Sequence, residues 1–143
     1  MLRSLTNRAQ LEGCWDIISN EDVLRVSSAW AGHPGSLVKN SSRYFSTTCE
    51  HGASAHGSTN CTLPAYQIWK KPLEGNKLAV LFVNIEEDAS ENISVELSDL
   101  GLEAGAVGVY NLYTRTQSTA SGSLTVPSLA PHTDAFFILS PST

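Results

Sequence analysis

The sequence contains few charged residues and no dense cluster of basic ones. Only 16% of its 143 residues are Asp, Glu, Lys or Arg, and fourteen acids against nine bases give a net charge of -5. The longest run of basic residues is the pair Lys70 and Lys71. Because binding to a phosphate backbone needs clustered positive charge, this composition argues against a nucleic-acid partner.

Long apolar runs are also missing. The longest strictly apolar segment, residues 78–83, is far shorter than the ~20 residues that a membrane-spanning helix needs. No apolar stretch follows Met1, so we expect no secretory signal in this chain and no membrane partner. With 41% hydrophobic residues and the length of one ordinary domain, the chain is expected to fold around a single core.

Cysteine is scarce, with only Cys14, Cys49 and Cys61. The polar stretch between Cys49 and Cys61 can close as a loop, so we predict a disulfide between them. Cys14 is then left to pair upstream or to lie buried as a small hydrophobe. A zinc set of Cys49, His51, His56 and Cys61 is the alternative, but this spacing matches no common site, and we expect neither a metal nor a cofactor.

Three Asn-x-Ser/Thr sequons make Asn40, Asn60 and Asn92 candidates for N-glycosylation. Together with the predicted disulfide, they favour a secreted or lysosome-like compartment. The leader that would deliver the chain there is missing from this sequence. We therefore expect the chain to be the back end of a longer protein, whose upstream part carries the signal.

Residues 1–30 have a helical pattern. Apolar residues recur there at i, i+3, i+4 and i+7, namely Leu11, Cys14, Trp15 and Ile18. Ser19, followed three residues later by Asp22, resembles a capping box for a second helical stretch. Glycine and proline in residues 32–35 end this pattern. We expect the apolar stripe either to dock beside residues 78–83 or to mediate dimerisation.

From residue 31 onward, short β-branched or aromatic segments alternate with Gly, Pro, Asn, Asp and Ser. They are residues 66–70, 78–85, 92–97, 106–113, 123–126 and 135–139. Segment 78–83 is apolar on both faces, so we place it centrally and expect it to be covered on both sides. The pattern predicts a mainly β fold, an antiparallel, Greek-key-like β-sandwich over residues 31–143, preceded by a short helical segment. Residues 72–76 are expected to connect a hairpin, and residues 46–63 to form a long surface loop.

Five segments occur in the order found in one enzyme family: residues 16–26, 66–84, 98–102, 110–113 and 126–141. The second contains a Trp-x-x-Pro-Leu sequence that reads Trp69-Lys70-Lys71-Pro72-Leu73 here. Through these segments the chain resembles glycoside hydrolase family 27, the α-galactosidase and α-N-acetylgalactosaminidase family. The resemblance implies that residues 1–30 end a (β/α)8 barrel and that the remainder is the C-terminal β-domain. Residues 27–35 and the insertion 46–63 depart from the family's pattern.

The catalytic residues of that family have no counterpart in this sequence. Its nucleophile lies in a Lys-Tyr-Asp motif, which is absent here. A retaining glycosidase needs two carboxyl groups about 5 to 5.5 Å apart on rigid strand ends. The acidic residues of this chain fall instead on helix surfaces, in turns and in the loop 86–91. The resemblance therefore implies a non-catalytic β-domain, whose partner is an upstream catalytic barrel that hydrolyses terminal α-galactosides.

A different class of function is an autonomous lectin-like or adhesion module, because exposed aromatic rings stack on sugars. The candidate sugar-contact residues are Trp30, Tyr44, Tyr66 and Trp69. Packing in the core or between domains is the stronger interpretation for them, since aromatic residues in strands usually supply buried area.

Overall fold

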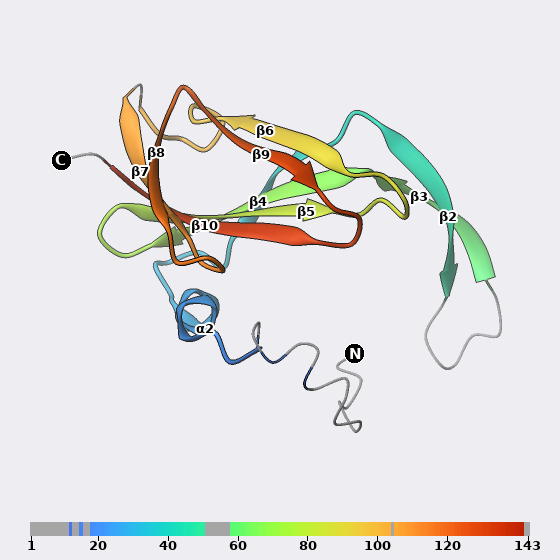
Figure 1. Ribbon diagram of the computed structural model, residues 1–143, viewed down its shortest axis with the longest axis horizontal. Helices are drawn as coiled ribbons and strands as arrows, with labels where there is room; N and C mark the ends of the chain where they lie inside the picture. Colours follow the sequence, from blue (N-terminus) through green and yellow to red (C-terminus); the bar gives the residue numbers. More distant parts are fainter. Residues whose placement is uncertain (1–11, 13–14, 16–17, 51–57, 104, 142–143) are drawn as a thin grey trace.

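The computed structural model describes residues 12, 15, 18–50, 58–103 and 105–141. They form helix α2 (Glu21–Ser28), one eight-stranded sheet and a separate two-stranded hairpin (Figure 1). The eight-stranded sheet has the order β1-β4-β5-β10-β7-β8-β9-β6. Its strands are β1 (Ser36–Asn40), β4 (Tyr66–Leu73), β5 (Lys77–Asn84), β6 (Glu91–Glu96), β7 (Ala106–Asn111), β8 (Gln117–Ser121), β9 (Ser123–Leu129) and β10 (Asp134–Pro141). All neighbouring strands are antiparallel, so the predicted mainly β, antiparallel fold is confirmed.

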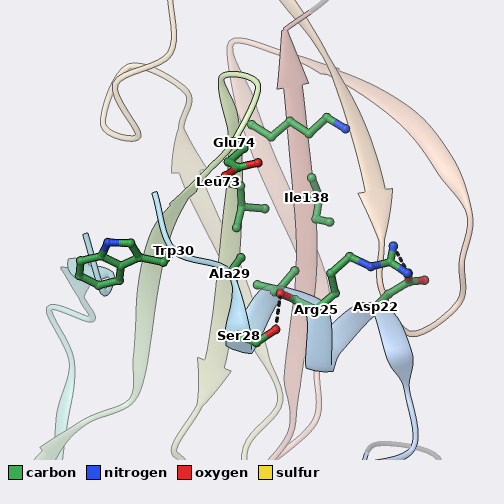
Figure 2. A pocket seen from close by; sticks show the side chains of 10 residues that line it. Asp22, Arg25, Ser28, Ala29, Trp30, Leu73, Glu74 and Ile138 are labelled. Atoms are coloured by element: carbon green, nitrogen blue, oxygen red, sulfur yellow. Dashed lines mark hydrogen bonds and ion pairs between the residues drawn. The ribbon is translucent and has the colours of Figure 1, made fainter. Parts of the chain in front are cut away.

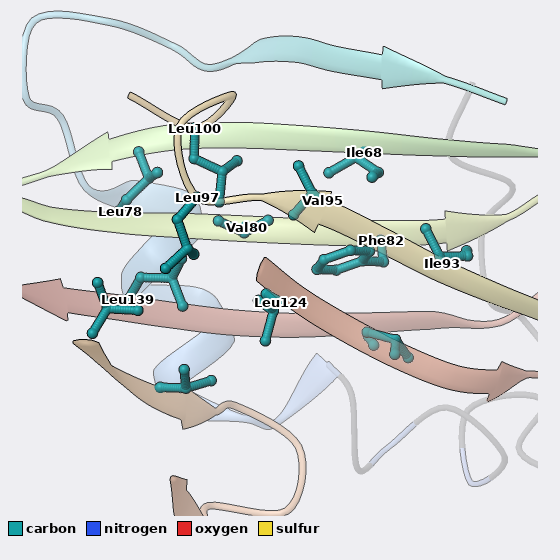
Figure 3. Packing of buried hydrophobic residues seen from close by; sticks show 14 of the residues in the cluster. Ile68, Leu78, Val80, Phe82, Ile93, Val95, Leu97, Leu100, Leu124 and Leu139 are labelled. Atoms are coloured by element: carbon teal, nitrogen blue, oxygen red, sulfur yellow. The ribbon is translucent and has the colours of Figure 1, made fainter. Parts of the chain in front are cut away.

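The sheet folds back on itself to form a sandwich. The turn between β8 and β9 is tight: Gly122 has a φ of 75°, and Ser121 and Ser123 on either side of it pair with each other. Beyond that turn, β9 and its partner β6 lie over β4, β5 and β10 (Figure 1). The two layers enclose the main apolar core, in which Ile93 and Val95 of β6 face Ile68 and Phe82 (Figure 3).

Strand β5 lies at the centre of this architecture. Leu78, Val80 and Phe82 point into the main core, where the rings of Phe82 and Phe137 meet edge to face with centroids 5.9 Å apart. On the opposite face, Ala79 is buried against helix α2. The prediction that this strand is central is therefore confirmed, but its outer face is fully buried only at Ala79, whereas Leu81 and Val83 stay partly exposed. The described residues form three layers: α2, the part of the sheet that contains β4, β5 and β10, and the part that contains β6 and β9.

The predicted loop at 46–63 is wrong for most of its length. Strands β2 (Tyr44–Glu50) and β3 (Ser58–Pro64) pair in register from Tyr44 opposite Pro64 to Glu50 opposite Ser58. The hairpin projects from one end of the sandwich (Figure 1). Its serine and threonine residues suggested a loop, yet threonine is β-branched and suits a strand. A disulfide joins Cys49 to Cys61 across this hairpin, with their Cα atoms 5.9 Å apart.

Helix α2 begins one residue later than the proposed capping box suggests. Asn20 is its N-cap, and the Asn20 Oδ1 atom accepts hydrogen bonds from the backbone N–H groups of Asp22 and Val23. The Ser19 hydroxyl instead donates to the Trp15 carbonyl oxygen at 2.6 Å. Asparagine and serine cap helices about equally well, so the sequence did not distinguish them.

The expectation that the first apolar stripe docks on the sandwich is not met by its described members. Residues 12, 15 and 18 are helical, but Trp15 is 55% exposed and Ile18 is 39% exposed. Leu11 and Cys14 lie outside the described residues. Val26 of α2 takes the place beside β5 instead. Within the described residues, no helix is long and apolar enough to cross a membrane.

Two matched substitutions test this assignment of the core. Phe82→Ala is expected to lower the free energy of unfolding by about 3 to 5 kcal/mol, because the ring is fully buried and leaves a cavity. Trp15→Ala removes a larger side chain that is mostly exposed, so its effect should stay within about 0.5 kcal/mol. Urea unfolding followed by circular dichroism measures both. A loss of several kcal/mol in Trp15→Ala would show that this side chain is packed in solution.

The disulfide gives a second prediction. Alkylation without reduction, followed by mass spectrometry, should leave Cys49 and Cys61 unmodified. Replacing both by serine is expected to lower stability by about 3 kcal/mol or less, because the bridge closes a short loop in a hairpin outside the main core. If both thiols alkylate in the native protein, the bridge is absent in solution.

Candidate functional site

A row of apolar side chains crosses the outer face of the sheet, the face turned away from β6 and β9. Strand register places Leu37 opposite Trp69, Trp69 opposite Leu81, and Leu81 opposite Phe136. Successive side chains of a strand alternate between faces, and the neighbours of these residues pack in the main core. We call Leu37, Trp69, Leu81 and Phe136 the outer row.

Helix α2 covers one end of this face. Val26 is buried against Ala79 and Leu112, next to Phe136. The Asn20 side-chain amide donates to the Leu112 carbonyl oxygen at 2.9 Å, so the residue that caps the helix also ties it to the sheet. The Tyr110 hydroxyl donates to Asp22 Oδ2 at 3.0 Å.

The last turn of α2 is fixed by a lysine from β4. Lys71 Nζ donates to the carbonyl oxygens of Val26 and Ser27 at 2.8 and 2.9 Å. A positive charge at this end of a helix satisfies free carbonyl groups and complements the helix dipole. The helix is therefore held to the sheet at both ends.

The other end of the outer row is open. Leu37 is 40% exposed and Trp69 is 39% exposed, although both lie in strands. Trp69 therefore does not pack in the main core, and of its two predicted roles, packing between domains stays a prediction. On the outer face its indole N–H donates to Gln67 Oε1 at 3.3 Å. A hollow of about 280 Å³ lies between Pro34 and the outer-row residues Trp69, Leu81 and Phe136.

A second hollow, of about 400 Å³, lies where α2 ends above the sheet. Figure 2 shows Leu73 and Ile138 on its sheet side and the Asp22–Arg25 ion pair toward the start of the helix. Trp30, 64% exposed, lies at the opposite end and points away from that ion pair (Figure 2). The hollow therefore combines an apolar floor with a charged margin.

Large exposed apolar residues gather on this side of the molecule. Apart from Tyr44 on the hairpin, those that the structure describes belong to residues 15–30 or to the outer row: Trp15, Ile18, Leu24, Trp30, Leu37 and Trp69. Contiguous exposed apolar patches on a folded domain mark interaction surfaces. Sequence analysis missed Leu37 and Phe136, although residues 135–139 are apolar on both faces and thus indicate a second covered side.

The four aromatic residues proposed to contact sugar do not form one platform. Trp69 points to the outer face, whereas Tyr66 packs against the main core. Tyr44 is on the hairpin, and Trp30 borders the hollow below α2. Because a sugar-binding surface needs aromatic rings on a common side, these residues do not by themselves build one.

Several of the carboxylates have structural partners. Arg43 forms ion pairs with Glu86 in the loop after β5 and with Glu91 at the start of β6, and these fasten the base of the hairpin to the sandwich. Glu87 accepts from Thr47 at 3.3 Å and lies 3.2 Å from a ring nitrogen of His132. Asp134 accepts a hydrogen bond from the Tyr113 hydroxyl. In the part of the chain that the structure describes, no group of acidic, histidine or cysteine residues could hold a metal ion.

The three sequon asparagines are all exposed on strands. Asn40 ends β1, Asn60 lies in β3, and Asn92 lies in β6. The Asn40 and Asn92 side chains accept hydrogen bonds, from Gln67 Nε2 at 3.0 Å and from the Ser128 backbone N–H at 2.8 Å.

Comparisons with known proteins agree with this architecture. The family described as the alpha galactosidase C-terminal beta sandwich domain matches residues 64–139. Among curated proteins, none matches the sequence. Solved structures share the fold: a GH27 β-L-arabinopyranosidase from Geobacillus stearothermophilus has a TM-score of 0.66 and 19% identity over 90% of this chain and 23% of its own.

Two further structures have the same fold. Alpha-galactosidase I from Mortierella vinacea has a TM-score of 0.64 and 15% identity, with 89% of this chain and 28% of that one covered. The isomalto-dextranase of Arthrobacter globiformis, solved with panose, has a TM-score of 0.65 and 20% identity, with 96% of this chain and 20% of that one covered. The chain thus spans about a quarter of the length of the enzymes it matches.

The tyrosine–carboxylate pairs near α2 and β10 predict an alkaline limit to stability. The hydrogen bond to Asp22 raises the pKa of Tyr110 above its ordinary 10.0, and burial together with the bond to Asp134 raises the pKa of Tyr113 further. The folded chain therefore holds both protons more tightly than the unfolded chain. This stability is fully present below pH 10 and is lost as the pH rises through the higher folded values.

The measurement compares urea midpoints of the wild type and the double variant Tyr110→Phe/Tyr113→Phe between about pH 8 and pH 11. The wild type should lose stability more steeply than the variant, which keeps the rings without the titrating hydroxyls. Parallel curves for the two proteins would contradict the assignment.

Proposed function

Because the chain belongs to the family of α-galactosidase C-terminal β-sandwich domains, we propose that it is the non-catalytic β-domain of an α-galactosidase-like retaining glycosidase. Its role there is to pack against an upstream catalytic (β/α)8 barrel. The observation that carries this proposal is the half-covered outer face, on which α2 buries one end of an apolar row and leaves Leu37 and Trp69 open.

The direction of the chain supports this partner. Residues 15 and 18 precede α2 and expose Trp15 and Ile18, and α2 itself lies on the outer face of the sheet. A domain that precedes residue 1 would reach this face through the same segment. Burial of apolar area contributes about 25 cal/mol per Å², so covering two tryptophans and two aliphatic residues is a substantial gain for such an interface.

Substrate choice belongs to the proposed barrel. Enzymes with this β-domain fold act on different sugars, as the arabinopyranosidase, α-galactosidase and isomalto-dextranase show. The hydrogen bonds and ion pairs of the carboxylates described above hold this domain together, so they offer no free acid and nucleophile. We assign terminal α-galactosides to the whole enzyme and a secreted or lysosome-like location to it, supported by the disulfide and the sequons.

The proposal predicts that the purified 143-residue chain releases no p-nitrophenol from p-nitrophenyl-α-galactoside above a denatured control. The protein encoded by the reading frame upstream of residue 1 together with this chain should release it. A rate from the short chain alone that survives purification would overturn the non-catalytic assignment. An upstream frame without a barrel would overturn the proposed partner.

Trp69→Ser tests the interface, and Tyr44→Ser is the matched control because its ring is also exposed but lies on the hairpin. In the longer protein, Trp69→Ser should lower the temperature of half-inactivation, since a buried contact is lost. In the short chain the same change should have a small effect on unfolding. Equal effects of the two substitutions in the longer protein would show that the outer row is not the interface.

A further inference from the structure

We propose that Asn60 is an N-glycan acceptor and that its glycan projects from the free face of the β2–β3 hairpin. This hairpin precedes the segment that matches the family, apart from its last residue, Pro64. The inference therefore rests on features of this chain and is independent of the proposed contact with a barrel.

The two faces of the hairpin differ in what they contact. One face carries the partly buried Phe45, Thr47, Cys61 and Leu63. Thr47 on that face bonds to Glu87, and Arg43 at the base holds the loop after β5. The other face carries the exposed side chains of Tyr44, Ser46, Thr48, Asn60 and Thr62, and among its described members only Pro64, at the base of the hairpin, is partly buried. Both recognition residues of the sequon therefore point to solvent on the same side.

The Asn60 sequon differs from the other two because its asparagine side chain forms no hydrogen bond with the described residues. The described residues give neither Asn60 nor Thr62 a side-chain hydrogen bond. In the Asn92 sequon, the asparagine accepts from the Ser128 N–H and the Ser94 hydroxyl bonds to Thr125 at 2.9 Å. A glycan on Asn60 thus displaces no contact of the folded protein.

The residues of the Asn40 sequon also form hydrogen bonds within the fold. The Asn40 side chain is bonded to Gln67 Nε2, and its middle residue, Ser41, is buried and donates its backbone N–H to the Tyr66 carbonyl oxygen at 2.9 Å. A sugar at this position would have to fit beside a strand pair whose side chains already interact.

The modification joins Asn60 to an oligosaccharide carried on a polyprenyl diphosphate. A C–N bond forms between Asn60 Nδ2 and the anomeric carbon of the first sugar, and the bond from that carbon to the phosphate oxygen breaks. The polyprenyl diphosphate leaves with the electron pair, and the amide nitrogen loses one proton to a base of the transferase. The same oxidising compartment permits the neighbouring Cys49–Cys61 disulfide.

A glycan here has a physical use. Within the described residues, strands β2 and β3 pair only with each other, so both outer edges of the hairpin are open there. Open strand edges invite pairing with other chains, and a bulky, hydrated group beside one of them blocks that approach.

In the test, the full chain is translated behind a cleavable signal sequence in the presence of endoplasmic-reticulum microsomes. Only the chains that the microsomal membrane protects from added protease are scored. Glycan number is read from endoglycosidase-sensitive mobility steps, and the modified asparagine from peptide mass spectrometry. Asn60→Gln and Thr62→Val should each lose one glycan, whereas Thr62→Ser keeps the hydroxyl and should retain it. Asn40→Gln and Asn92→Gln are controls that leave the Asn60 glycan in place.

An unmodified Asn60 in the protected wild-type chain would overturn the proposal, and so would an Asn60 glycan that persists in Thr62→Val. A second measurement tests the structural claim with wild-type chains that carry the Asn60 glycan. Their thermal midpoint should be unchanged by enzymatic deglycosylation. A fall or rise of the midpoint would show that the sugar contacts the folded protein and that the face is not free.

Discussion

Strand β5 has buried side chains on both faces, and the rest of the fold is arranged to cover them. Its inward side chains need the β6–β9 layer, which reaches them only because the sheet turns back at Gly122. Its outward side needs α2, which is too short to be stable as an isolated helix. The helix is stable because its own residue Val26 packs against Ala79 and Leu112. In addition, Asn20 and Lys71 hydrogen-bond its two ends to the sheet.

With this arrangement, the outer face of the sheet is only partly covered. One helix of eight residues covers the β7–β10–β5 side, while the β4–β1 side keeps Trp69 and Leu37 partly exposed. A domain that folds alone would be expected to place polar residues at such positions. The sequence places apolar ones there, which is the composition of an interaction surface.

Patterns with strong apolar periodicity were readable from the sequence, and polar strands were not. The central strands and the turn at 74–76 follow from β-branched runs and from Gly75 and Asn76, which both adopt a positive φ. Strands β2, β3 and β8 are rich in Ser and Thr, so they resemble loops and are defined only by their partners. The outer row could not be read as a unit because its four residues come from four strands, and only tertiary register brings them together.

The position of β10 has a consequence for synthesis of the protein. The last strand, Asp134–Pro141, lies between β5 and β7 in the middle of the sheet and contributes Leu139 and Phe137 to the core. While the ribosome still encloses residues 134–141, β5 and β7 lack the strand that joins them, and the apolar faces of both stay open. Formation of the complete sheet is therefore delayed until residues 134–141 have left the ribosome.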